Sequence, residues 1–194
     1  MKKLSFIFAT VLLFAGATVV NAQSTTTASH TVAITIAEHA LVGIKGSTTS
    51  NAITITPTLP TEAGDPLSFA SSTKNSDLWL NYSSIVQGTK RRTITAALSA
   101  NTLPLGISLQ LAATTVDPNG NGKGELGTTS MSTATTLTGT AQEVIGGIGS
   151  CHTSKGQNQG SNLTYSVIVN NVDYATLVAS GYSTTVTYTI TDDL

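Results

Sequence analysis

Cysteine is almost missing from this sequence, since Cys151 is the single one among 194 residues. A lone thiol excludes an intrachain disulfide, so the fold has to be stabilised by packing alone. The paired cysteine ligands that usually mark a structural zinc site are missing as well. Two interpretations of Cys151 stay open: a partly buried thiol in a glycine-rich turn, and an intermolecular disulfide.

Charged side chains are also few, at 10% of the chain, and nine basic residues face ten acidic ones. This balance does not favour nucleic acid or an anionic membrane as a partner, because both attract clustered positive charge. The one basic cluster, Lys-Arg-Arg at residues 90–92, follows Gly88 and is expected to be a solvated hairpin turn. The partners left open are other copies of this chain, other surface subunits and glycans.

Long hydrophobic runs are missing beyond the first residues. Residues 1–22 combine Lys2 and Lys3 with an apolar stretch and small residues before Gln23, which is typical of a bacterial signal peptide. No second stretch of about 18 apolar residues follows, so no membrane span is expected after cleavage. We therefore expect an exported protein, periplasmic, cell-surface or extracellular, with residues 23–194 forming a single domain.

Threonine and serine are abundant instead, with 56 residues between them. Branched threonine suits a half-exposed pleated surface, and from residue 30 apolar and polar residues alternate with period two. Strands are expected at residues 30–38, 51–57, 77–86, 91–99, 105–115, 135–140, 162–170 and 183–193. The apolar phase shifts between Tyr82 and Ile85, which predicts a bulge near Ser83 and Ser84.

Short alternating strands between Gly, Asn, Ser and Pro turns are typical of an antiparallel sheet protein. The fold class expected is an all-β antiparallel sandwich, Ig-like or jelly-roll-like, with about nine strands. At most one or two helical turns are expected, near residues 174–179. The glycine- and threonine-rich residues 117–134 are expected to form a long exposed loop.

The start of this loop carries the spacing D-x-N-x-N-G, with Asp117, Asn119 and Asn121 as oxygen ligands for a weak calcium candidate. The twelfth position is Thr128 instead of a bidentate Glu. A plain Asn-Gly turn explains the same residues, because it needs positive φ. No cofactor other than this calcium alternative is expected.

Catalytic groups do not form a recognisable set. Cys151 and His152 are adjacent, and neighbouring residues on an extended chain point to opposite faces, so the imidazole is poorly placed as the base of the thiol. We expect no enzyme and no catalytic residue. Trp79 is out of phase with the apolar residues around it, so an outward Trp79 together with residues 117–134 is the alternative hypothesis of a glycan-binding module.

The alternating segments "TVAITIAE" (residues 31–38) and "TTVTYTITDD" (residues 184–193) follow an export signal. In this pattern the chain resembles exported bacterial β-sandwich proteins, namely fimbrial subunits of the chaperone–usher and spore-coat-U kind and Ig-like adhesin modules. The resemblance implies a non-enzymatic surface or extracellular structural protein, an adhesin or a filament subunit. It also implies that a strand with Val32, Ile34 and Ile36 covers a neighbour's sheet edge, the alternative being that this strand pairs within its own domain.

Overall fold

The computed structural model describes residues 27–46, 51–69, 73–100 and 103–193. The expected signal peptide therefore lies outside the described residues. By its internal contacts the chain divides into two units, residues 1–35 and residues 36–194. In the first unit, residues 27–35 form neither helix nor strand, and every assigned strand belongs to the second unit.

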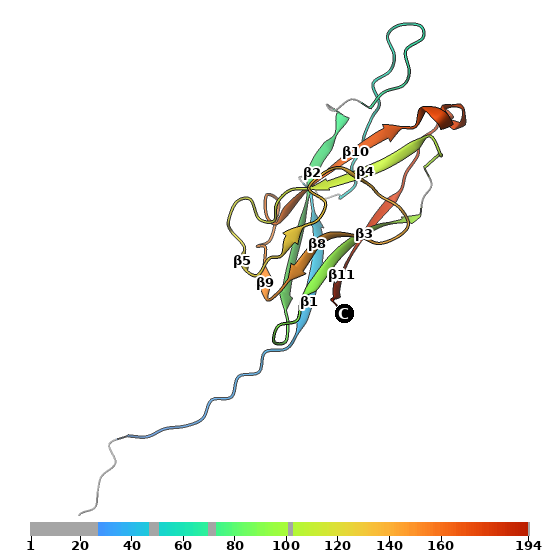
Figure 1. The fold of residues 1–194 in the computed structure, drawn as a ribbon. Coiled ribbons are helices and arrows are strands. Elements are labelled where there is room, and N and C mark those ends of the chain that lie inside the picture. Colours follow the sequence, from blue (N-terminus) through green and yellow to red (C-terminus); the bar gives the residue numbers. More distant parts are fainter. Residues whose placement is uncertain (1–26, 47–50, 70–72, 101–102, 194) are drawn as a thin grey trace, which may run out of the picture. The chain divides into compact units, whose positions relative to one another are not determined.

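The second unit is a sandwich of two antiparallel sheets (Figure 1). The first sheet contains β1 (His39–Lys45), β2 (Asn75–Ile85), β4 (Ile107–Ala113), β5 (Lys123–Gly124), β7 (Thr135–Thr136), β9 (Cys151–His152) and β10 (Ser161–Val169). The second sheet contains β3 (Arg92–Ala100), β6 (Thr128–Thr129), β8 (Gln142–Ile148) and β11 (Thr185–Asp192). The predicted all-β antiparallel sandwich is confirmed, with eleven strands in the described residues because four two-residue strands add to the long ones.

The strand order of each sheet differs from the order of the strands in the sequence. The first sheet runs β5-β9-β2-β10-β4-β7, and β1 pairs with the other edge of β2. The second sheet runs β11-β3-β8-β6. A short 3₁₀ helix, η2 (Asn171–Thr176), joins β10 to β11, close to the helical turn that the sequence predicted.

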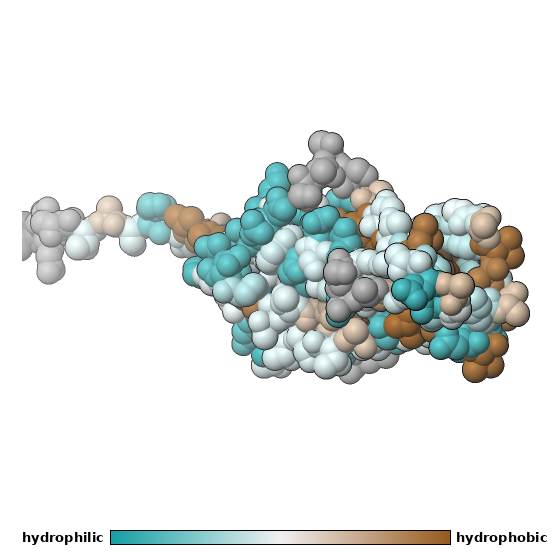
Figure 2. All heavy atoms as spheres, turned by 90° about the horizontal axis from the view of Figure 1, so that it is seen from above, coloured by the Kyte–Doolittle hydropathy of each residue, from teal (hydrophilic) through white to brown (hydrophobic). Residues whose placement is uncertain are grey.

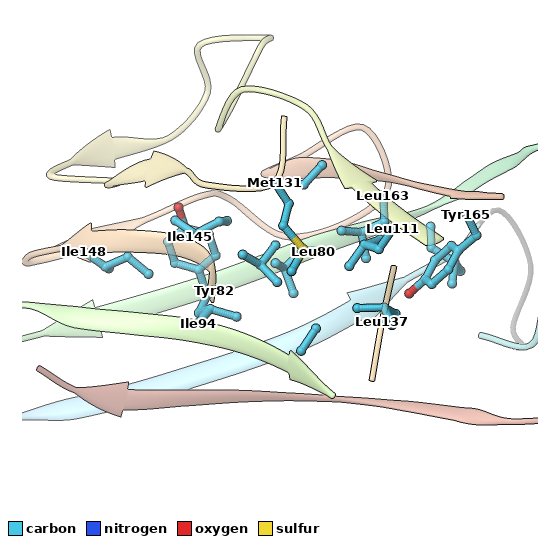
Figure 3. Close-up of a cluster of buried hydrophobic side chains, with 14 of the residues drawn as sticks. Leu80, Tyr82, Ile94, Leu111, Met131, Leu137, Ile145, Ile148, Leu163 and Tyr165 are labelled. Carbon is cyan, nitrogen blue, oxygen red and sulfur yellow. The ribbon is translucent and has the colours of Figure 1, made fainter. Parts of the chain in front are cut away.

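The core lies between the two sheets and is filled by the inward residues of the alternating strands (Figure 3). Fully buried side chains come from both sheets, among them Leu80, Ile94, Leu111, Ile145, Ile148 and Leu163. Tyr165 of β10 and Tyr188 of β11 join the sheets through their hydroxyl groups, whose oxygens are 2.7 Å apart. The period-two pattern thus places one apolar face of each sheet inward.

The turn predicted between β2 and β3 is present, with Lys90 N donating to Gln87 O at 3.3 Å. The predicted pairing of these two strands as a hairpin is wrong, however, because β2 and β3 belong to opposite sheets. The predicted bulge is also wrong: β1 pairs with β2 in unbroken register, and Ser84, not Ile85, takes the fully buried position. A polar residue can occupy that position because Arg92 binds its hydroxyl.

Two expected strands near the start of the chain are not strands. Residues 30–38 carry no strand, and β1 begins only at His39. Residues 51–57 carry none either, although Ile53 and Ile55 pack half-buried against the core. Alternation makes a segment compatible with a sheet, but a partner edge is needed as well.

The segment 117–134 is not a long exposed loop. It contributes β5 to one sheet and β6 to the other, and Met131 is buried in the core. The glycine-rich stretch around Cys151 is likewise built into strands β8 and β9. Gly160, which precedes β10, has φ of +72°, and a Cβ there would lie 2.1 Å from Leu80 O, so this backbone approach requires glycine.

No helix in the described part of the chain is long and apolar enough to span a membrane.

Candidate assembly site

The leading segment, residues 30–38, is the most exposed apolar part of the described chain that the sequence singled out. Its alternating side chains Val32, Ile34 and Ile36 are 68%, 82% and 76% exposed. Figure 2 shows hydrophobic residues open to solvent along the extended segment. Three branched aliphatic side chains on one face of an unpaired segment are unfavourable in water, so this segment has the properties of a strand without a sheet.

Arg92 holds the start of β1, the strand that follows this segment in the sequence. Its Nη1 donates to His39 O at 2.6 Å, to Ser84 Oγ at 3.0 Å and to Ile85 O at 3.1 Å. Its Nε donates to Asp192 Oδ1 at 2.6 Å. One guanidinium therefore joins the start of β1, the end of β2 and the end of β11, and it does so while only 6% exposed.

The sequence interpretation of residues 90–92 as a solvated turn is therefore wrong for Arg92. Lys90 and Arg91 behave as expected, since Lys90 is exposed and Arg91 forms a solvent-accessible ion pair with Glu125 (Nη2 to Oε2, 3.0 Å). A signal for the burial of Arg92 was present in the alternation, because Arg92 shares its phase with the inward residues Ile94 and Ala96. The charge of Arg92, and not its inward position in the alternating pattern, had suggested a solvated turn.

Two strands leave sheet edges open beside this point. β1 pairs only with β2, and β11 pairs only with β3, so within the described ranges each has one edge without a ladder partner. The two strands lie side by side at the same side of the sandwich (Figure 1). Unpaired backbone N–H and C=O groups on such edges can pair with an added strand.

Trp79 lies on the outer face of the first sheet, as its phase suggested. It is half-buried and stands opposite Lys45 of β1 and Asn162 of β10. None of the described hydrogen bonds joins it to residues 117–134. The hypothesis of a glycan-binding module that uses Trp79 and residues 117–134 stays a prediction.

The calcium candidates form a turn with internal contacts. Asp117 has φ of +52° and its Oδ2 accepts a hydrogen bond from Gly122 N, while its buried Oδ1 has no hydrogen-bond donor. Asn119 Nδ2 donates to Asn158 O at 2.6 Å. Asn121 is engaged through its backbone carbonyl, which accepts from Ser154 Oγ at 3.0 Å. These contacts match the Asn-Gly turn interpretation, and calcium stays a prediction.

Cys151 and His152 point to different environments. Cys151 is buried, and burial together with the nearby negative Glu125 raises the pKa of its thiol to about 11. His152 is exposed, and its Nδ1 accepts a hydrogen bond from Ser154 N at 3.3 Å. A thiol that is protonated at neutral pH and faces away from the imidazole is a poor nucleophile. Across the described residues, no three His, Cys, Asp or Glu side chains come together in a way that could hold a metal ion.

Comparisons with known proteins found no matching family model, no similar curated protein and no similar solved structure.

Proposed function

We propose that this chain is a non-enzymatic, exported structural subunit that assembles with other copies by donating residues 30–38 as a β-strand to a sheet edge. The observation that carries the proposal is the exposure of Val32, Ile34 and Ile36 on an extended segment that belongs to no sheet. The compartment rests on the signal-like residues 1–22, and a surface filament or adhesive fibre is the kind of assembly we propose.

The energetics favour such a donation. Burying a Val or Ile side chain contributes roughly 1.5–3 kcal/mol, so the three side chains together contribute about 5–9 kcal/mol. Backbone pairing along the edge adds register and specificity, because a shift by one residue would turn the apolar face outward. This gain is of the same order as the cost of bringing two chains together, about 4–15 kcal/mol.

Strand donation also allows an open assembly as well as a closed dimer. The donated segment and the receiving edge are different parts of the chain, so each copy can donate to one neighbour and receive from another. Contacts of this heterologous kind extend into filaments when the rotation between copies does not close a ring.

The test uses the chain from residue 23 onward, with the double variant Ile34→Thr/Ile36→Thr. Threonine keeps the branched β-carbon and the strand propensity but removes apolar surface. The matched control is Thr31→Ser/Thr35→Ser, which changes the opposite face of the same segment. Size-exclusion chromatography with light scattering and electron microscopy measure the assembly state.

We expect the unmodified chain and the control to form concentration-dependent oligomers, and the Ile variant to remain monomeric. An unmodified chain that stays monomeric at high concentration, or an Ile variant that assembles as the control does, would contradict strand donation.

A further inference from the structure

Within the described residues, two buried side-chain oxygen atoms have no hydrogen-bond partner, Asp117 Oδ1 and Gln159 Oε1. They belong to two turns, residues 117–122 and residues 156–160. Buried polar atoms in folded proteins almost always have a partner, and a buried carboxylate oxygen needs one most because it carries charge. Asp117 is only 9% exposed, so water outside the protein solvates little of this charge.

The two turns are bonded to each other. Asp117 N donates to Gly160 O at 3.0 Å, so the residue that follows Gln159 lies directly against Asp117. Asn119 Nδ2 donates to Asn158 O at 2.6 Å, which places the Asn119 amide between the two turns. The fold therefore brings one carboxylate and two amide side chains to the junction of the turns.

The charge of Asp117 has no basic partner in the described part of the chain. Of the ion pairs found there, one uses Glu125 and the other Asp192. Lys123, which follows the first turn, directs its Nζ to Gly120 O at 3.3 Å. A bound cation would supply the positive charge that these side chains do not.

The nearby phenol of Tyr82 does not satisfy Asp117 Oδ1 either. Its hydroxyl donates to Leu126 O at 2.5 Å. Burial raises the pKa of Tyr82, and the negative charges of Cys151 and Asp117 raise it further. The carboxylate of Asp117 thus acts on a buried neighbour, as expected where water screens charge poorly.

We propose that a calcium ion binds at the junction of these turns, held by Asp117 Oδ1, Gln159 Oε1 and the amide oxygen of Asn119. Calcium takes about six to eight oxygen ligands in flexible geometry, and water fills the remaining positions. With one carboxylate the site is weak, with a Kd on the order of 10⁻⁴–10⁻³ M, as in extracellular calcium modules. This inference does not depend on strand donation.

The spacing D-x-N-x-N-G indicated Asp117 and Asn119 as oxygen ligands, but not Gln159. Gln159 comes from a distant part of the chain, and only the bonds between the two turns bring it close. The calcium ion would join the two turns and stabilise the folded chain.

The experiment measures Tm of the chain from residue 23 by circular dichroism, first in EDTA and then with increasing calcium. Calcium that binds only the folded chain raises Tm, by about 3–6 °C at about ten times Kd. Magnesium demands octahedral geometry and dehydrates reluctantly, so at the same concentrations it should shift Tm by less than half as much. Isothermal titration calorimetry gives the Kd.

Two variants change the ligands in opposite directions. Asp117→Asn keeps the shape but removes the charge, so it should abolish the calcium response and should not lower Tm in EDTA. Gln159→Glu adds a second carboxylate, so it should lower Tm in EDTA by repulsion and tighten calcium binding about tenfold. The matched control Asp65→Asn neutralises an exposed turn carboxylate and should leave the calcium response unchanged.

A Tm of the unmodified chain that does not respond to calcium would overturn the proposal, and so would an equal response to magnesium. A calcium response that survives Asp117→Asn would place the ion elsewhere. Circular dichroism in EDTA shows whether each variant is folded. If one of the two variants does not fold, the other still decides, because their expected effects on calcium affinity have opposite signs.

Discussion

Replacement of Arg92 by alanine should destabilise the sandwich more than any other single removal of charge. The change takes away a buried guanidinium that donates to His39 O, Ser84 Oγ and Ile85 O. The Ser84 contact is buried and the two carbonyl contacts are partly buried, and each acceptor then loses a charged donor at a cost of about 1 kcal/mol. We expect a loss of about 3–4 kcal/mol in the free energy of unfolding.

The ion pair with Asp192 contributes little to this figure. The Asp192 side chain is 58% exposed, so water can solvate it once Arg92 is gone, and exposed pairs contribute about 0–1 kcal/mol. For a domain of this size, a loss of 1 kcal/mol lowers Tm by about 2–4 °C. The expected shift is therefore roughly 10 °C, measurable by circular dichroism or calorimetry.

Two variants make this prediction specific. Arg91→Ala removes the neighbouring arginine, whose partner Glu125 is largely exposed, and should cost less than about 1 kcal/mol. Arg92→Lys keeps the charge but loses the planar fork that reaches several acceptors, so it should recover less than half of the loss. If Arg92→Ala melts within 2–3 °C of Arg91→Ala, the buried arginine does not hold the three elements together and the reasoning fails.

The remaining predictions concern the buried hydroxyl and thiol groups. Tyr165→Phe or Tyr188→Phe alone should cost about 1 kcal/mol because the partner hydroxyl loses its hydrogen bond between the sheets, while the double variant should cost less than the sum. Additive losses in urea unfolding would contradict that coupling. Burial raises the pKa of Cys151 from 9.0 to about 11 and of Tyr165 from 10.0 to about 12, so the folded chain retains protons that the unfolded chain loses. Stability should therefore be full below about pH 9 and fall as the pH rises toward 12, and a flat Tm across this window would argue against buried ionisable groups. At pH 8 a thiol reagent should modify Cys151 about 100-fold more slowly in the folded than in the unfolded chain, from the thiolate fractions alone.

The long strands could be predicted from the sequence because each buries only one face. β2, β4 and β10 lie within two residues of their expected bounds, since a half-buried strand requires apolar residues at alternate positions. Of the two-residue strands in residues 117–136, β5 and β6 could not be predicted, because so short a pairing leaves no period to detect, and only Thr135–Thr136 of the strand expected at residues 135–140 is a strand, β7. Their backbone meets β9, β8 and β4, which are distant or later parts of the chain.

The candidate assembly site could also be predicted from the sequence only in part. Val32, Ile34 and Ile36 were recognisable from alternation, but only the structure shows that the segment stands outside the sheets. Arg92 was expected in a surface turn because it belongs to the basic run at residues 90–92. Its burial depends on acceptors from β1, β2 and β11 that meet at one point, and the sequence does not show this.

By itself, the sequence determined that this is an all-β protein of alternating strands with a single thiol and little charge, because those properties depend on local periodicity and composition. The tertiary structure decided which segments share a sheet, why β2 and β3 lie apart despite a tight turn, and that residues 33–36 and 52–55 have different environments. The physical reason is that backbone pairing requires a partner edge, and the two Ala-Ile-Thr-Ile segments are packed or exposed according to whether their isoleucines lie against the core.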